Sequence, residues 1–409
     1  MYKNGAAAYI HAAFSQLLQS YLHSAMIFSW ALLFISLVAS CGNEQNVSST
    51  TEHETIGDFS FESKIKYAQH FSIRNHGTWK QLTVTDPWQG GILGNYVLVP
   101  RSSPLPDSLP PDAVVVRVPL RTVACLSSTH IGVLAILGLR DKIVGVASGD
   151  QIWDSVVGKR FASGSIIEVG RKMNTNIEQL IALSPEMVMK SGFDNVRSED
   201  TRIAEAHIPI AYYLEWMEPT LLARAEWMKF TAAFFCQERL ADSLFDGIES
   251  RYTDALRLAS SVADKPSVLV GVEYKSTWHI AGERSYVAQM LGDAGAAFIP
   301  NGEKGDSPMS FEQVLQLHAN DDIWLNWMHQ GINSIETLGR MNERYELFKA
   351  YRTGEVYNHD KRLNPAGGND FWESGVSHPD LLLKDLIKIF HPELLPDYEM
   401  VYWRKLPQK

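Results

Sequence analysis

The pattern of apolar and polar residues changes near residue 113. Before that point, "FSIRNHGTWKQLTVTDPW" and "NYVLVP" alternate apolar and polar residues, with Gly, Pro and Asp at the breaks. This alternation is typical of antiparallel strands with one exposed face, so residues 59–112 are predicted to contain two or three of them. After residue 113, short apolar strands such as "KIVGVAS" alternate with helical segments such as "THIGVLAILGL". That order predicts an α/β fold with parallel sheets and crossover helices.

A long helical pattern divides the α/β part of the chain. Between Leu221 and Ala259, apolar residues recur every three to five positions with no Pro among them, which is the helical period. We therefore predict one uninterrupted helix over 221–260. About 38 helical residues would span roughly 57 Å, which is too long for a crossover within one small domain. The helix is predicted to join two lobes, because the strand and helix alternation resumes after residue 261.

Two segments on either side of this helix resemble each other. "NIEQLIALSPEMVM" and "SFEQVLQLHANDDIWL" share Glu-Gln near the start of a helix, then a Leu, a loop and an apolar strand. The recurrence predicts two similar lobes, each with an acid in the first turn of a helix, Glu178 and Glu312. These acids can have a purely structural role, because a negative charge is stabilised at the positive end of a helix dipole, and Thr175 and Ser310 can cap the two helices. Alternatively, two exposed carboxylates could dock on paired basic sites of a two-fold symmetric partner.

An apolar run of about 15 residues, from Ala25 to Ala39, precedes the folded part. It is short for a membrane span and suits the core of a signal peptide. The sequence "VASC" that ends at Cys41 resembles a bacterial lipobox, which implies cleavage before Cys41 and lipidation of its thiol. Residues 41–58 would then be a flexible, polar tether. The alternative is an uncleaved anchor helix in which this cysteine is incidental.

Composition and motifs narrow the functional classes. The formal net charge of −10 argues against nucleic-acid binding, which needs a basic surface. Cys41, Cys125 and Cys236 are too few for a disulfide framework. The sequence contains no G-x-x-x-x-G-K-[ST], H-E-x-x-H, C-x-x-C or G-x-S-x-G motif. The chain is therefore predicted to be neither an ATPase nor an enzyme.

Several segments, in order, resemble the metal-chelate class of periplasmic substrate-binding proteins, which includes iron-siderophore, haem and cobalamin binders. They are "RTVACLSSTHIGVLAILGLRDKIVGVAS", "VGRKMNTNIEQLIALSPEMVM", the long helix and "MSFEQVL". The resemblance runs from about residue 113 to 391. It implies an α/β fold of two Rossmann-like lobes joined by one long backbone helix, with little closure between the lobes. It also implies a monomeric, lipid-anchored protein on the periplasmic side of the inner membrane, with the outer membrane as an alternative.

The resemblance also implies partners and cargo. The lobes would hold a metal chelate in the cleft between them and deliver it to an ABC permease dimer with its ATPase subunits. Glu178 and Glu312 match the acids that pair with permease arginines in this family. The protein would need no cofactor besides the chelate itself, either a ferric siderophore, which is favoured, or cobalamin or haem. From another class, the alternative is a lipoprotein enzyme or a metal-cluster scaffold that uses Cys125 and Cys236.

Candidate ligand contacts follow from the fold class, because open α/β sheets bind ligands at loops after the carboxyl ends of strands. Aromatic walls suit a large, flat or apolar chelate, and aromatic residues occur at several such loops: Trp153, Trp216, Tyr274, Trp278, Trp327 and Trp372. Arg171 and Lys172 lie in the "VGRKMN" loop, near a position where siderophore binders carry a basic residue. His130 could be an axial metal ligand if the cargo were haem, although a histidine at a helix start is more often a plain polar residue.

These interpretations divide the chain into six consecutive parts. They are a lipoprotein signal peptide at 1–40, a tether at 41–58, a strand section packed on the first lobe at 59–112, an N-terminal α/β lobe at 113–220, the linking helix at 221–260 and a C-terminal α/β lobe at 261–409. The strand section is not part of the family's common pattern, so its role is open.

Overall fold

The computed structural model describes residues 59–171, 174–193, 198–303, 305–327 and 331–409. All described residues belong to one compact unit, which lies within Ile56–Lys409. The predicted signal peptide, the tether and Cys41 lie outside the described residues. Within the described part, no helix has the length and apolar character needed to cross a membrane.

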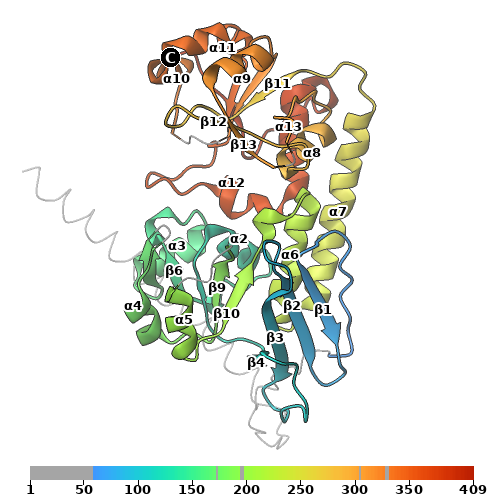
Figure 1. Ribbon diagram of the computed structural model, residues 1–409, viewed down its shortest axis with the longest axis vertical. Coiled ribbons are helices and arrows are strands. Elements are labelled where there is room, and N and C mark those ends of the chain that lie inside the picture. The colour runs from blue at the N-terminus through green and yellow to red at the C-terminus, as the bar shows by residue number, and fades with distance from the viewer. Residues whose placement is uncertain (1–58, 172–173, 194–197, 304, 328–330) are drawn as a thin grey trace, which may run out of the picture. The chain divides into compact units, whose positions relative to one another are not determined.

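A four-stranded sheet opens the described part of the chain (Figure 1). Its first three strands are antiparallel, as predicted, and the fourth runs parallel to the third. The sequence pattern places the fourth strand in the first lobe, but it joins this sheet because the Pro-rich loop 101–112 returns the chain alongside the third strand. Arg117 fixes that return by donating hydrogen bonds to the carbonyls of Pro100 and Ser103. The strands are β1 (Phe71–Asn75), β2 (Lys80–Thr85), β3 (Ile92–Pro100) and β4 (Val114–Val118).

This N-terminal sheet is fixed to the rest of the unit by buried polar contacts. The Tyr96 hydroxyl on β3 donates a hydrogen bond of 2.8 Å to the Ile210 carbonyl on the edge of the first lobe. The ammonium group of Lys80 lies 2.5 Å from the Glu238 carboxylate, and both side chains are buried. Removing one partner of such a pair leaves an uncompensated charge in the interior, which costs several kcal/mol.

The first lobe is a six-stranded sheet in the order β10-β9-β5-β6-β7-β8. All neighbouring strands are parallel except the last pair. Helices connect the strands, as expected for parallel pairing, so the α/β prediction is confirmed here. The strands are β5 (Val123–Cys125), β6 (Ile143–Ala147), β7 (Ile167–Arg171), β8 (Asn174–Thr175), β9 (Val188–Ser191) and β10 (Ile210–Tyr213), and the helices are α2 (Ser128–Ile136), α3 (Ser155–Ala162), α4 (Ile177–Leu183) and α5 (Ser198–Glu205).

The helical stretch after β10 is divided into two helices, α6 (Leu221–Ala233) and α7 (Glu238–Ser260). The prediction of one uninterrupted helix over 221–260 is therefore corrected. The chain reverses at Cys236, whose φ is +55°, and the two helices pack antiparallel, with Lys229 of α6 lying 3.4 Å from Asp242 of α7. α6 is buried on all sides, whereas α7 buries one face. The long helix that joins the lobes is α7, whose 23 residues span about 35 Å.

The second lobe has a four-stranded sheet in the order β11-β14-β15-β16 and a separate antiparallel pair, β12-β13. The first three strands of the sheet are parallel, and the C-terminal strand is added antiparallel at the edge. The strands are β11 (Val268–Val270), β12 (Trp278–Ile280), β13 (Ser307–Met309), β14 (Ile323–Asn326), β15 (Val356–Asn358) and β16 (Arg404–Lys405), and the helices are α8 (Tyr286–Asp293), α9 (Phe311–His318), α10 (Ile335–Met341), α11 (Lys349–Thr353), α12 (Asp370–Glu373) and α13 (Pro379–Phe390).

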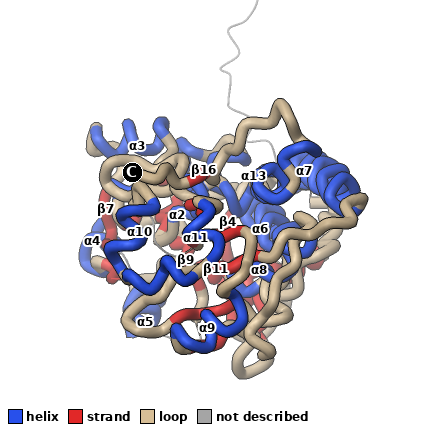
Figure 2. The backbone as a smooth tube through the Cα atoms, turned by 90° about the horizontal axis from the view of Figure 1, so that it is seen from above, coloured by secondary structure: helices blue, strands red, loops and turns tan. Residues whose placement is uncertain are grey.

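One hydrophobic core runs through both lobes and the helices between them. It includes Leu82 of the N-terminal sheet, Val146 of the first lobe, Phe230 of α6, Phe245 of α7 and Leu386 of α13. α7 and α13 pack side by side, as the view from above shows (Figure 2). Because separating the lobes would expose this shared apolar surface to water, the core opposes large hinge motions.

Candidate functional site

A cavity of about 480 Å³ lies between the two lobes. The first lobe lines it with loops that follow β5 and β6, including Ser127, Ser128 and Ser148. The second lobe lines it with His359, which follows β15, with Gly367, Gly368 and Asn369 just before α12, and with Trp372 in α12. These loops lie at the carboxyl ends of parallel strands, where open α/β sheets bind ligands.

The described residues that line this cavity offer hydroxyls, amides and rings rather than formal charges. Ser127 is held by the start of α2, because its hydroxyl accepts a hydrogen bond from the Thr129 amide. Asn369 caps α12 by accepting from the Phe371 amide, and its own amide donates to the His359 carbonyl. The walls can therefore orient a neutral or modestly polar ligand against Trp372.

His359 is the residue of this cavity with the most distinctive chemistry. It is 1% exposed, and its ring packs edge-on against those of Phe371 and Trp372, with centroid distances of 4.8 and 5.5 Å. Burial lowers the pKa of His359 to about 4, so the imidazole is neutral at neutral pH. Its Nδ1 lies 3.1 Å from the Asn326 carbonyl, and a carbonyl can only accept, so Nδ1 carries the proton.

This arrangement is the one that metal-binding histidines adopt. The second ring nitrogen, Nε2, keeps its lone pair, while the Nδ1–H group orients the ring through a backbone carbonyl. Sequence reasoning missed His359 because, among the strand ends, it singled out tryptophan, tyrosine and one basic loop, and its only histidine candidate was His130. Its position at the end of the predicted strand "EVYNH" was the signal. Among the described residues, no three His, Cys, Asp or Glu side chains gather closely enough to hold a metal ion.

The structure places the predicted aromatic contacts in different environments. Trp372 lines the cavity, and Trp327, which is 5% exposed, packs behind it with a ring distance of 6.4 Å. Trp278 is fully buried in the second lobe and donates to the Val270 carbonyl, so its prediction as a ligand contact is wrong. Trp216 and Tyr274 are 38% and 53% exposed and do not line this cavity.

Trp153 lines a different cavity, of about 510 Å³, which is formed by α2, the loop before α3 and residues near α12. The guanidinium of Arg362 lies 5.4 Å from the Trp153 ring centroid and pairs with Asp370 at 3.0 Å. Arg140 also lines this cavity and pairs with Asp154 at 2.8 Å. Both cavities are lined by residues of the two lobes, but the described lining of this second one contains ion pairs and that of the first one does not.

The predicted polar contacts do not face the cavity. Arg171 is exposed and lies 3.2 Å from Asp150 and 3.6 Å from Glu168, while Lys172 lies outside the described residues. His130 is 1% exposed, and burial lowers its pKa to about 3. It lines a space of only about 10 Å³, which has no room for a chelate, so its prediction as an axial ligand is wrong.

The two lobes touch directly at an inter-lobe clamp, formed by residues 150–154 of the first lobe and 364–373 of the second. The Glu373 carboxylate accepts hydrogen bonds from the amides of Trp153 and Asp154 at 2.8 and 2.7 Å. The Asn364 side chain donates to the Ile152 carbonyl at 3.0 Å. Gly368 leaves no space, because a Cβ there would lie 2.0 Å from the Gln151 carbonyl oxygen. The clamp forms one wall of the cavity between the lobes.

Glu178 and Glu312 lie in the first turns of α4 and α9, as predicted, and their side chains are 77% and 72% exposed. Each pairs with an arginine of its own lobe at 2.8 Å, Arg202 and Arg344. The hydrogen bond from Arg202 lowers the pKa of Glu178, and the backbone amide at the helix start, with Arg344, lowers that of Glu312. Both carboxylates are thus ionised and accessible.

Of the two predicted helix caps next to these acids, one is confirmed and the other is not. Ser310 and Gln313 form the predicted capping box of α9. In α4 the cap is Asn176, whose side chain accepts from the Gln179 amide, rather than the predicted Thr175. Asn is a better cap than Thr and lies one residue closer to the first apolar helical position.

Comparison with known proteins identifies the family. The family model described as "Periplasmic binding protein" matches residues 123–363, and this chain belongs to that family. An uncharacterised lipoprotein of Methanocaldococcus jannaschii is 24% identical over 383 residues, which cover 86% of this chain and 87% of the relative. The periplasmic heme-binding protein RhuT from Roseiflexus sp. RS-1, in apo form, has a TM-score of 0.51 at 17% identity and covers 67% of this chain and 99% of its own. S. aureus IsdE complexed with heme has a TM-score of 0.50 at 19% identity, covering 66% and 99%.

These findings confirm the resemblance and the fold class. The protein is a periplasmic binding protein and not an enzyme. The named relative is a lipoprotein, in agreement with a lipid-anchored protein, while lipidation at Cys41 stays a prediction. At these identities the solved structures establish the fold and not the ligand.

Proposed function

We propose that the cavity between the lobes binds a metal chelate, and that haem or a similar planar metal macrocycle is its first candidate. The observation that carries this proposal is the neutral imidazole of His359, buried in the cavity wall with Nδ1 held by the Asn326 carbonyl. A planar macrocycle leaves the axial positions of its metal open, and imidazole nitrogen is a common axial ligand of haem iron.

The rest of the cavity supports a flat and mainly apolar ligand. Its volume of about 480 Å³ lies within the usual range for small-molecule sites. Trp372 offers a ring for stacking, and the hydroxyls of Ser127 and Ser128 can contact polar substituents. Two solved neighbours in the same fold are described as heme-binding or as complexed with heme, which agrees with this choice.

A ferric siderophore is the second candidate, and Arg171 is the observation that favours it. Arg171 is exposed at the carboxyl end of β7, the end of the sheet where ligands bind, although it does not line the cavity. A hexadentate siderophore saturates its iron, so His359 could then contact only the organic shell. The anionic shell would instead need cations, and Arg171 would have to leave Asp150 and Glu168 to supply one.

Delivery would follow from the two exposed carboxylates. We propose that Glu178 and Glu312 exchange their internal partners, Arg202 and Arg344, for arginines of a permease dimer. Ion pairs at exposed sites contribute little to stability, so this exchange costs little. A lipid on Cys41, with residues 41–58 as tether, would keep the protein beside its transporter on the periplasmic face of the membrane.

The test is a binding panel on the full-length protein with hemin, cyanocobalamin and ferric ferrichrome. We expect hemin to bind with the sharp Soret band of an imidazole-ligated iron, at a stoichiometry of one. Tight binding of ferrichrome with weak hemin binding would favour the second candidate. Failure to bind all three probes would contradict the proposal.

A further inference from the structure

The N-terminal sheet lies outside the residues matched by the family model, which begins at residue 123. We infer that this sheet contributes to ligand binding, through Trp88 in the loop between β2 and β3. With Phe193 and Trp216, Trp88 would form an aromatic platform that stacks on a flat, conjugated, apolar part of the chelate extending beyond the central cavity. This inference rests on the proposed function and assigns a role to residues that the sequence pattern left open.

The three rings gather at one place. The Trp216 ring centroid lies 6.2 Å from that of Trp88 and 5.8 Å from that of Phe193. Trp216 is 38% exposed, which is unusual for a tryptophan that already has two aromatic neighbours. The platform therefore presents ring surface to solvent, and stacking on a flat ligand would bury that surface.

The platform lies at the edge of the first-lobe sheet where ligands bind. Phe193 follows β9 and Trp216 follows β10, so both are at the carboxyl ends of their strands. The sheet order β10-β9-β5-β6 places them beside the loops after β5 and β6 that line the central cavity. One to three strand spacings separate the two places, on the order of 5–15 Å. A chelate larger than the central cavity can reach both.

The loop that carries Trp88 is built to a fixed conformation. The Asp86 carboxylate accepts a hydrogen bond from the Trp88 amide at 2.9 Å, and the Gly90 amide donates to the Asp86 carbonyl at 3.1 Å. Gly90 has a φ of +76°, which suits glycine and closes the turn. Leu93 packs against the backbone of Gly192, just after β9. The position of Trp88 is thus set by contacts with the first lobe.

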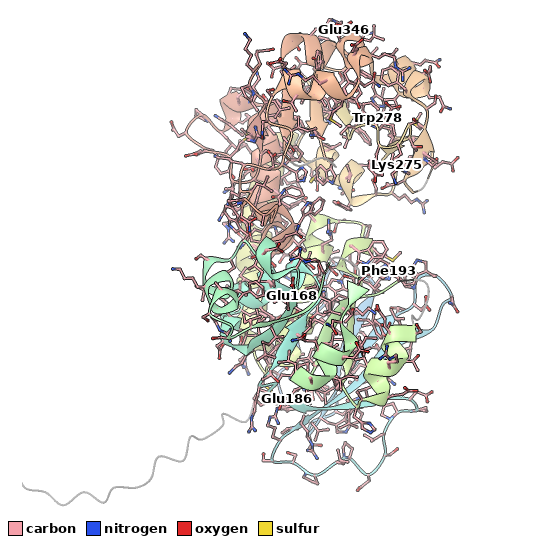
Figure 3. All side chains as sticks on the ribbon, turned by 90° about the vertical axis from the view of Figure 1, so that its left-hand side faces the viewer. Glu168, Glu186, Phe193, Lys275, Trp278 and Glu346 are labelled. Atoms are coloured by element: carbon pink, nitrogen blue, oxygen red, sulfur yellow. The ribbon has the colours of Figure 1, made fainter. Side chains whose placement is uncertain are left out.

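The second lobe presents an exposed aromatic residue of its own after its first strand. Tyr274, after β11, is 53% exposed and forms a tight turn with Thr277, with amide–carbonyl bonds of 2.7 and 3.0 Å in both directions. Lys275 and Ser276 in the turn have φ values of +49° and +61°, a conformation that is costly for residues other than glycine and often marks a functional site. Figure 3 shows Lys275 and Phe193 on facing margins of the two lobes.

The experiment compares hemin affinity of full-length variants by calorimetric titration. Trp88→Ala should weaken binding about tenfold, the order expected for losing one aromatic stacking contact, and Trp88→Phe should restore most of it. The matched control is Trp79→Ala, because Trp79 lies on the same sheet at the opposite turn and stacks on His76 at 3.9 Å. That variant should bind hemin within twofold of the wild type.

The outcomes separate this inference from the proposed function. If Trp88→Ala keeps its melting temperature and binds hemin as tightly as Trp79→Ala, the platform plays no part in binding and the inference is wrong, while the central site stands. If Trp88→Ala loses its melting transition, Trp88→Phe decides, and unchanged affinity of Trp216→Ala would also overturn the inference. If the wild type binds none of hemin, cyanocobalamin and ferrichrome, the proposed function fails and this inference fails with it.

Discussion

The inter-lobe clamp makes the stability of the protein depend on pH through Glu373. Burial raises the pKa of Glu373 from 4.5 to about 7, against the two amide hydrogen bonds that lower it. Between these values the folded protein keeps a proton that the unfolded chain has released, so the free energy of unfolding falls as pH rises. The gap between 4.5 and about 7 corresponds to about 3 kcal/mol. Roughly 2.5 kcal/mol of it should appear between pH 5 and pH 8.

The substitution Glu373→Gln isolates this effect because glutamine does not titrate. Its amide nitrogen would face one of the two backbone amides of Trp153 and Asp154, a cost that does not change with pH. Relative to the wild type, the variant should therefore gain roughly 2.5 kcal/mol of stability from pH 5 to pH 8.

Urea unfolding of both proteins at several pH values in this range measures the gain. The control is Glu343→Gln, at an exposed position on the second lobe. Its free energy of unfolding should differ from that of the wild type by the same amount at every pH. A flat difference for Glu373→Gln would refute the reasoning, because it would mean that the clamp carboxylate is ionised throughout.

Two further predictions concern the N-terminal sheet and the docking acids. Lys80→Met should lower the free energy of unfolding by about 3 kcal/mol, since it leaves the buried Glu238 carboxylate unpaired; urea unfolding measures this, and the double variant with Glu238→Leu should recover most of the loss. Charge reversal of Glu178 or Glu312 should leave hemin affinity unchanged, because both side chains are exposed and outside the cavity, but should lower uptake by cells. Equal loss of binding in both variants would show that the acids do not act in docking.

Much of the fold could be predicted from local patterns. The alternation of strands and helices, and the two similar segments around Glu178 and Glu312, predicted two lobes. This was possible because the strand and helix periods depend on residues that are close together in the sequence. The division at Cys236 could not be predicted, because the apolar period continues across it and no Pro or Gly marks the reversal. Only tertiary packing distinguishes α6, buried on all sides, from α7, buried on one face. The prediction placed β4 in the first lobe for the same reason. Its pairing with β3 is decided by tertiary contacts across the intervening loop, which the local pattern does not reveal.

The candidate site was less predictable than the fold. Residues after strand ends could be found by the rule that gave Trp372, but the rule cannot tell which side chains turn inward. Trp278 satisfied it and is fully buried, while His359 satisfied it and was missed. The clamp could not be foreseen, because Glu373 and Trp153 lie far apart in the sequence and meet only when both lobes are folded.

The central claim is that His359 binds the metal of a planar chelate, and a Soret titration of His359→Ala with hemin tests it most directly. His279→Ala is the matched control, because His279 is exposed on β12 and is not among the residues that line the cavity. We predict that His359→Ala binds hemin at least tenfold more weakly and with a shifted Soret band, that added imidazole returns the band to its wild-type position, and that the control is unchanged. A wild-type spectrum and affinity in His359→Ala would contradict the account.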